Sequence, residues 1–289
     1  MSSGEIYVVK SSGEREPFSE AKLRHSLERA QAAPELVDRA VQQMLSELRD
    51  GMPTSVIYRR AFALLRKHKR SLAARYSLKK ALMELGPTGH PFEKLVGEIM
   101  RSQGYNVEVA RTVQGACVAH EVDVVAIKGE RHIMVECKFH NEAGVKSDVK
   151  VALYVQARFE DIEKAWQAQA GHGKHFDEAW LVTNTKLTSD AVQYAHCVGM
   201  KAIGWSFPPG GSLSELIDHA NLHPITSLTS LNKSQKMRLI SSGIVLCRDI
   251  VDHPEVLASV RINGSNSDKI LEEAHELCQD RKKYEQKTE

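Results

Sequence analysis

The sequence of 289 residues lacks the features of a membrane or secreted protein. It contains no apolar run of the roughly 20 residues that a transmembrane helix needs. Its first residues, MSSGEIYVVK, contain no apolar core of the kind found in a signal peptide. The five cysteines are scattered and include no CxxC pair, which argues against a zinc site and favours free thiols in a reducing compartment. We therefore expect a cytoplasmic protein with no membrane partner.

The sequence also contains no P-loop, the phosphate-binding loop of many ATPases, so we do not expect the protein to use ATP hydrolysis as an energy source. Its hydrophobic content of 42% and charged content of 26% are typical of a globular protein, and its length allows two or three domains. The net charge of +2 is unevenly distributed, because residues 1–88 hold 16 Lys and Arg against 10 Asp and Glu. The basic excess between residues 59 and 70 can contact phosphates, although such a run is more often a solvated helix face.

Turn signals and changes of pattern divide the chain into three parts, at 1–88, 89–212 and 213–289. The first part starts with two short strands, 6–10 and 15–18, which can form a hairpin. Ser19 is a candidate N-cap for the helix that follows. Further helical patterns cover 34–49, 54–67 and 71–85. The first part is thus expected to be a β-hairpin beside a small helical bundle.

The second part alternates helices and strands. Its helices are expected at 90–102, 147–170 and 189–198, and its strands at 105–110, 122–127, 133–139, 179–183 and 201–206. This order predicts a mixed sheet flanked by helices. After a short helix at 214–220, residues 225–289 are predicted to be helical. The fold class is therefore multidomain α/β, with a small all-α C-terminal region.

Three residues of the second part have the chemistry of a metal-assisted hydrolase. Glu136 and Lys138 are two positions apart on a predicted strand, so their side chains leave the same face. Asp123 lies on the preceding strand, across one tight turn, and can approach Glu136. Two neighbouring carboxylates repel each other unless a cation lies between them, and Mg²⁺ prefers such oxygen ligands. Ordinary surface charges on edge strands are the alternative interpretation.

Residues 90–206 resemble the Mrr-type restriction endonuclease domain of the PD-(D/E)xK superfamily. The resemblance rests on the stretches HPFEKLVGEIMRSQGYNVEVA, HEVDVVAIKG, HIMVECKFH and LVTNTKLTSDAVQYAHCVGMKAIGW. It implies that Asp123 and Glu136 bind Mg²⁺ or Mn²⁺ and that Lys138 is catalytic. It also implies supporting roles for Glu93 on the first helix and Gln156 on the helix after the motif.

Four other residues near these motifs are given other interpretations. Glu98, one turn after Glu93, is expected to be solvated. His120 and His140 flank the motifs and are expected to be bystanders. Cys137 lies between Glu136 and Lys138, so it is expected to face the core, away from the metal.

Residues 5–88 resemble an ATP cone, the nucleotide-binding regulatory domain of ribonucleotide reductases and of their repressor. The matching text is VVKSSGEREPFSEAKLRHSLERA, PTSVIYRRAFALL and AARYSLKKAL. Two departures, at Ser11 and Tyr58, leave open a helical interaction domain that has lost its ligand. The resemblance implies that ATP or dATP is held by Lys10, Lys22 and Thr54, in a site lined by Glu16, Phe18 and Leu23.

Residues 225–280 resemble tandem helix-hairpin-helix repeats, in LNKSQKMRLISSGIVLCRDI and PEVLASVRINGSNSDKILEEAHEL. Gly243 and Gly264 would occupy the turns, where backbone N–H groups can bind a DNA phosphate. A helical oligomerisation module is an equally good interpretation of this segment.

These resemblances together predict a Mg²⁺-dependent DNA endonuclease, of restriction or repair type, regulated by adenine nucleotide. Its DNA would be duplex, modified or branched, and a homodimer is expected because double-strand cutting needs two sites. A nucleotide-sensing DNA-binding protein without cleavage activity is the alternative from a different class. A nuclease acting on RNA is a second alternative, because the motif residues address the phosphodiester and not the bases.

Overall fold

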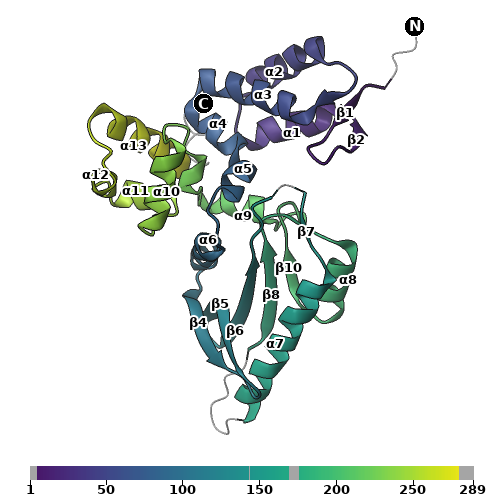
Figure 1. Ribbon diagram of the computed structural model, residues 1–289, viewed down its shortest axis with the longest axis vertical. Coiled ribbons are helices and arrows are strands. Elements are labelled where there is room, and N and C mark those ends of the chain that lie inside the picture. The colour runs from purple at the N-terminus through teal and green to yellow at the C-terminus, as the bar shows by residue number, and fades with distance from the viewer. Residues whose placement is uncertain (1–4, 143, 169–175, 280–289) are drawn as a thin grey trace. The chain divides into compact units, whose positions relative to one another are not determined.

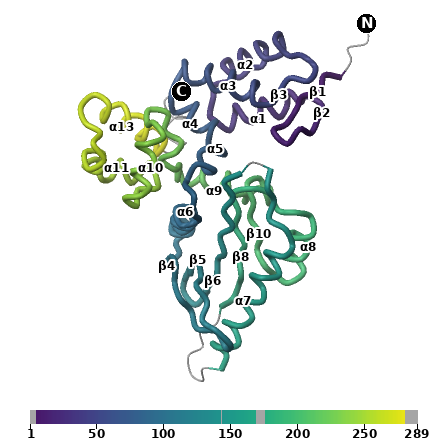
Figure 2. The backbone as a smooth tube through the Cα atoms, viewed as in Figure 1, coloured from purple at the N-terminus to yellow at the C-terminus, as the bar shows by residue number. Residues whose placement is uncertain are grey.

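The computed structural model describes residues 5–142, 144–168 and 176–279, and these form two compact units (Figures 1 and 2). The terminal unit consists of residues 1–81, 225–236 and 247–289. The sheet unit consists of residues 82–224 and 237–246. Residues 213–224 therefore belong with the sheet, and most of the C-terminal helices group with the N-terminal part.

The N-terminal part of the terminal unit is a three-stranded sheet with helices. Strand β1, Tyr7–Val9, pairs antiparallel with β2, Arg15–Pro17, and parallel with β3, Met52–Pro53. The hairpin is present as expected, and the Ser19 side chain accepts a hydrogen bond from the backbone N–H of Lys22 at the start of the next helix. The helices are α1, Glu20–Arg29, α2, Pro34–Glu47, α3, Thr54–His68, α4, Arg70–Tyr76, and α5, Leu78–Met83.

The single helix expected over residues 71–85 is two helices, α4 and α5, separated at Ser77. The Ser77 hydroxyl donates a hydrogen bond to the backbone carbonyl of Ala74 at 3.0 Å. Such local side-chain bonds compete with the helical hydrogen-bond ladder, and a pattern of apolar residues does not reveal them.

The C-terminal segment is helical, as expected. After a 3₁₀ turn at Ile225–Ser227, it forms α10, Lys233–Ser241, α11, Cys247–Asp252, α12, Val256–Ser259, and α13, Ser265–Cys278. The two glycines expected at turns lie between helices with positive φ, 84° at Gly243 and 62° at Gly264. Glycine adopts such φ values without the steric cost that other residues meet.

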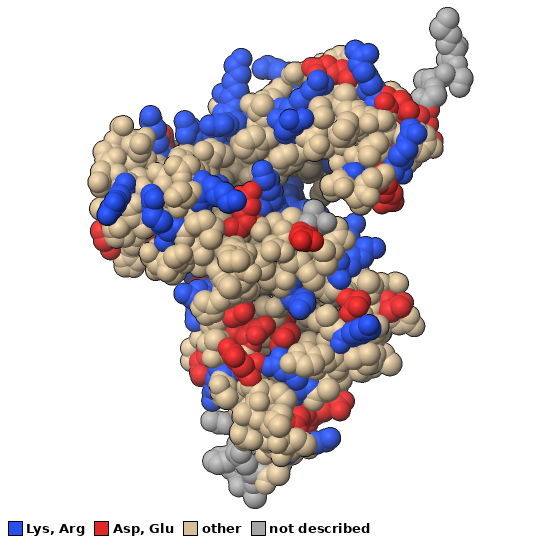
Figure 3. Space-filling view, viewed as in Figure 1, with Lys and Arg blue, Asp and Glu red and all other residues tan. Residues whose placement is uncertain are grey.

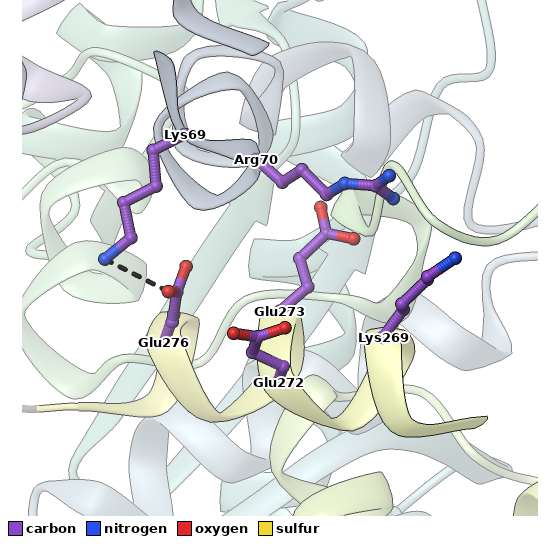
Figure 4. A pocket seen from close by; sticks show the side chains of 6 residues that line it. All are labelled: Lys69, Arg70, Lys269, Glu272, Glu273 and Glu276. Carbon is purple, nitrogen blue, oxygen red and sulfur yellow. Dashed lines mark ion pairs between the residues drawn. The ribbon is translucent and has the colours of Figure 1, made fainter. Parts of the chain in front are cut away.

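Within the terminal unit, α4 packs against α13. The buried Arg75 side chain on α4 donates from Nη2 to the backbone carbonyls of Glu276, at 3.1 Å, and Leu277, at 3.4 Å. Lys69 forms an ion pair with the Glu276 carboxylate at 3.1 Å, drawn as a dashed line in Figure 4. These contacts cover the last turn of α13, where carbonyl groups lack helical partners. The neighbouring charged cavity is lined by Lys69, Arg70, Lys269, Glu272, Glu273 and Glu276 (Figure 4).

The sheet unit contains a five-stranded sheet, which is mixed, as the sequence predicts. Its strand order is β10-β8-β6-β5-β4. Strands β4, β5 and β6 form an antiparallel meander, and β8 and β10 extend it in parallel to β6. Their bounds are Asn106–Gln114 for β4, Ala119–Lys128 for β5, Arg131–Lys138 for β6, Glu178–Thr183 for β8 and Lys201–Ile203 for β10. Two short strands that the sequence does not indicate, β7 at Lys146–Ser147 and β9 at Lys186–Leu187, form a separate ladder.

Helices cover both faces of this sheet (Figure 1). Helix α6, His90–Ser102, has the expected bounds and packs on the meander. Helices α7, Val149–Ala168, and α8, Ser189–Cys197, cover the opposite face. The predicted end of α7 at residue 170 falls outside the described residues. Helix α9, Leu213–Ala220, completes the unit. No helix among the described residues is long and apolar enough to cross a membrane.

Candidate functional site

Strands β5 and β6 bring the predicted catalytic residues together. In the antiparallel register Val124 lies opposite Val135, so Asp123 and Glu136 occupy the next positions along the two strands. The Asp123 carboxylate accepts a hydrogen bond from the backbone N–H of Cys137 at 2.7 Å, which ties it to β6. This contact places the Asp123 side chain beside the motif strand.

Alternation along β6 separates the catalytic side chains from the core. Glu136 is partly buried and Lys138 is exposed, whereas Cys137, between them, is buried, as expected. Burial raises the pKa of the Cys137 thiol well above the usual value. The strand therefore presents one partly buried carboxylate and one exposed ammonium on the face opposite to Cys137.

The two carboxylates are held in a site that disfavours their charge. The pKa of Asp123 is raised to about 6, mainly by burial and to a lesser extent by the charge of Glu93. The pKa of Glu136 is raised to about 7, mainly by burial and then by the neighbouring Asp123 charge. The nearby Arg158 and Lys138 act in the opposite direction on Glu136. A nearby cation stabilises the ionised form of carboxyl groups in such a site.

The donor set fits a hard divalent ion. Among the described residues, no three His, Cys, Asp or Glu side chains are gathered closely enough to hold a metal by themselves. Mg²⁺ does not need such a cage, because it retains several waters and binds through one or two carboxylates. Asp123 and Glu136 satisfy that requirement. Figure 3 shows acidic side chains gathered on the sheet unit, with basic ones beside them.

Sequence reasoning missed one residue of this site, Arg158 on α7. Its side chain is 7% exposed, and its Nη1 contacts the Glu136 carboxylate in a very close ion pair. Its Nη2 contacts the backbone carbonyl of Glu121 on β5. Its spacing could have indicated that it is buried. Arg158 lies three residues after Val155 and four residues before Ile162, in the apolar stripe of α7 that faces the sheet.

The two predicted supporting residues differ in their surroundings. Glu93 on α6 is partly buried and near enough to Asp123 for its charge to raise the pKa of that group. It also pairs with His90 at 3.2 Å. The Gln156 side chain instead donates to Glu160 at 3.0 Å along the exposed side of α7. The supporting role of Gln156 therefore stays a prediction.

Both flanking histidines have structural hydrogen bonds. His140 binds the Ser147 hydroxyl through Nε2 at 3.0 Å, and burial lowers its pKa. His120 binds Asp161 of α7 through Nε2 at 2.8 Å. Asp161 also accepts from the backbone N–H groups of Cys117, at 2.9 Å, and Val118, at 3.3 Å. This carboxylate therefore anchors the β4–β5 turn to the helix.

The terminal unit holds the predicted nucleotide residues around one pocket. Its volume is about 160 Å³, and Tyr58 and Tyr76, whose rings stack at 5.3 Å, contribute to its lining. The predicted site residues on the lining are Glu16, Phe18, Lys22, Leu23 and Thr54.

Charge in this pocket is arranged around Glu16. Its carboxylate pairs with Lys10 at 2.9 Å, which links that residue to the site although it is not on the lining, and with Lys22 at 3.2 Å. The Lys10 hydrogen bond is the main cause that lowers the pKa of Glu16. Lys10 also pairs with Glu14 at 3.1 Å, so a phosphate that binds the two ammonium groups would replace the contacts that they make with Glu14 and Glu16.

Family models match three segments of the chain. The ATP cone domain matches residues 6–83, the Mrr catalytic domain, described as restriction endonuclease, matches 86–204, and the model described as AF1548-like, C-terminal, matches 223–278. The last match does not address helix-hairpin-helix function, which stays a prediction.

An uncharacterized protein of Archaeoglobus fulgidus is 36% identical over 183 residues, which are 63% of this chain and 99% of that protein. The crystal structure of the protein of unknown function AF1548 covers 66% of this chain and 98% of its own, at 34% identity and a TM-score of 0.54.

The MspJI restriction endonuclease in complex with a 27-mer oligonucleotide matches at 13% identity and a TM-score of 0.32, covering 83% of this chain and 48% of its own. That similarity is too low to support an inference. The restriction endonuclease model spans the helices and strands of the sheet unit from α6 to β10. The chain therefore belongs to the AF1548-like family, with a restriction endonuclease domain of the Mrr type between an ATP cone and the AF1548-like C-terminal segment.

Proposed function

We propose that this protein is a Mg²⁺-dependent endonuclease that hydrolyses phosphodiester bonds in DNA under the control of adenine nucleotide. One observation carries the proposal. Two partly buried carboxylates with raised pKa values, Asp123 on β5 and Glu136 on β6, lie within a restriction endonuclease domain, and Glu136 shares its strand face with the exposed Lys138.

Asp123 and Glu136 would hold Mg²⁺ or Mn²⁺, which would lower the pKa of a bound water and neutralise phosphoryl oxygens. Lys138, with its exposed ammonium, would orient the attacking water and stabilise negative charge that develops on the phosphoryl group. The water oxygen forms a bond to phosphorus while the bond to one ester oxygen breaks, and that oxygen takes up a proton. Glu93 would strengthen the negative field at Asp123. Gln156 would support the site from α7.

The cone pocket supports regulation by ATP or dATP. Lys10 and Lys22 would bind the phosphates, and Thr54, Phe18 and Leu23 would contact the rest of the nucleotide. Nucleotide can regulate cleavage only if it binds one conformational state more tightly than another.

The substrate would be duplex, modified or branched DNA, and the role restriction or repair. The site residues address the phosphodiester and not the bases, so they define the reaction more closely than the sequence that is cut. A homodimer would supply the two active sites that a double-strand break requires.

The test is cleavage of supercoiled plasmid, methylated and unmethylated, with Mg²⁺ or Mn²⁺ and with or without ATP. We expect metal-dependent nicking that Lys138→Ala abolishes. Lys128→Ala is the matched control, because that exposed lysine on β5 binds the Gln103 carbonyl and not the motif residues. If the purified wild type leaves plasmid, junction DNA and RNA intact, the proposal is wrong and a nucleotide-sensing DNA-binding protein takes its place.

A further inference from the structure

Arg158 is a buried cation at the centre of the candidate active site. Its neighbours along the helix face, Ala152, Val155 and Ile162, are fully buried apolar residues. Burying a guanidinium in such a stripe is costly unless it is paired and hydrogen-bonded. A role beyond packing would explain why this position is not apolar.

The hydrogen bonding of Arg158 is incomplete. Nη1 contacts Glu136 and Nη2 contacts the Glu121 carbonyl, but the buried Nε has no hydrogen-bond partner. A purely structural arginine gains most when all its donors are satisfied. The Nε–H group is therefore a hydrogen-bond donor that this arrangement of Arg158 does not use.

Arg158 also has an aromatic surface beside it. Its guanidinium carbon lies 5.3 Å from the ring centre of Tyr154, which is 59% exposed. A planar guanidinium can remain on an aromatic face while its hydrogen-bond partner changes. Tyr154 therefore offers contact to Arg158 in more than one arrangement.

We propose that Arg158 occupies the place of the metal at Glu136 in the metal-free enzyme and transfers to the substrate phosphate when the metal binds. This inference rests on the proposed function. Before binding, the guanidinium neutralises Glu136 in its partly buried site. After metal binding, the Glu136 carboxylate is a ligand of the metal. The N–H groups of the Arg158 guanidinium, including Nε–H, then donate hydrogen bonds to a phosphate oxygen of the nucleic acid. Arg158 is thus both a competitor of the metal and a binding residue for the substrate.

The test measures metal binding apart from cleavage. Mn²⁺ affinity is measured on the full-length protein without DNA at pH 8, by titration calorimetry and paramagnetic resonance, for wild type and Arg158→Gln. This pH lies above the raised pKa values of Asp123 and Glu136, so both carboxyl groups are mostly ionised. We expect Arg158→Gln to bind Mn²⁺ on the order of tenfold more tightly, because one repelling and competing charge is gone. At saturating metal we expect the same variant to cleave plasmid about a hundredfold more slowly.

The matched control is Arg131→Gln, which removes another arginine–glutamate pair of β6, with Glu178, at the opposite end of the strand. We expect it to change neither metal affinity nor cleavage. Far-ultraviolet circular dichroism and thermal unfolding confirm that each variant is folded, and Arg158→Lys serves as a second variant if Arg158→Gln does not fold.

The two failures are distinguishable. If wild type cleaves DNA but a folded Arg158 variant binds Mn²⁺ equally or more weakly, Arg158 is a structural residue and only this inference is wrong. If wild type neither binds Mn²⁺ nor cleaves, both this inference and the proposed function are wrong.

Discussion

The two candidate sites of this protein shift the pKa values of their carboxylates in opposite directions. In the cone pocket Glu16 pairs with two lysines, one of which also pairs with Glu14, and the pKa of Glu16 is lowered. In the endonuclease site two carboxylates, Asp123 and Glu136, are near one arginine, and their pKa values are raised.

This difference indicates the kind of ligand that each site favours. Lysines that are already paired with carboxylates can exchange them for an anion such as a nucleotide phosphate, whereas carboxylates whose charge is disfavoured by burial are stabilised by a cation. The predictions below change one charge or one contact at a time, in order of decreasing expected effect.

Asp123→Asn should have the largest effect, because it removes half of the carboxylate pair. We expect metal-dependent plasmid cleavage to fall about a thousandfold, since the metal loses a charged ligand. Nicking rates at saturating Mg²⁺ measure the loss. Glu108→Gln, at an exposed position of β4, should cleave normally. Equal rates for wild type and a folded Asp123→Asn would remove this residue from the site.

Gly115→Ala tests the packing around the Asp161 carboxylate, which is hydrogen-bonded to His120 and to the β4–β5 turn in the sheet unit. An added Cβ would lie 2.1 Å from an Asp161 carboxylate oxygen and 2.6 Å from the Val118 backbone oxygen. The helix and the turn must both shift, so we expect a loss of about 2 kcal/mol in unfolding free energy by urea denaturation. Gly211→Ala is the control, because its added Cβ meets nothing closer than 3.7 Å. Equal losses in both variants would contradict the steric argument.

Lys22→Met tests whether the lysines of the cone pocket bind the phosphates of a nucleotide. We expect ATP affinity, measured by calorimetry, to fall about tenfold with the loss of one charged contact to phosphate. Glu16→Gln should have the opposite effect, because it releases Lys10 and Lys22 from their competitor.

Lys67→Met, on an exposed lysine outside the pocket lining, should bind ATP as the wild type does. If all three variants bind ATP equally well, the nucleotide binds elsewhere or the cone has no ligand.

Asp161→Asn should have the smallest effect, visible mainly as a change in pH dependence. Hydrogen bonds from His120 first, and from the β4–β5 turn, lower the pKa of Asp161 in the folded protein. Because the unfolded chain binds that proton more tightly, the stabilisation is complete above about pH 4 and is lost as the pH falls towards the folded value. Urea unfolding at pH 5, 4 and 3 should show the difference between wild type and variant shrinking on acidification. A difference independent of pH would mean that Asp161 acts without its charge.

The sequence predicts much of the sheet unit because its signals are local. The apolar spacing of Phe92, Leu95 and Ile99 defines α6, and alternation along β6 separates Glu136 from Cys137. The resemblance to a known family adds support for the order of helices and strands along the chain, and it identifies the motif residues. The cone residues lie around one pocket for the same reason, since the hairpin and the first helix that carry most of them are continuous in sequence.

Long-range contacts explain what the sequence did not predict. Arg158 meets Glu136 across 22 residues, and nothing in its own helix indicates which strand it faces. The packing of α4 on α13 depends on a hydrogen bond across 201 residues. The short ladder of β7 and β9 has only two residues in each strand, too few to form an alternating pattern.

The contact between Arg75 and the end of α13 bears on the order in which the nascent chain folds. The cone emerges from the ribosome before α13, and the carbonyls that Arg75 binds follow 201 and 202 residues later. At ordinary rates of translation this gap lasts on the order of ten seconds or more, during which Arg75 does not have these two acceptors. The endonuclease domain is synthesised within that interval, so it can fold before the terminal unit is complete.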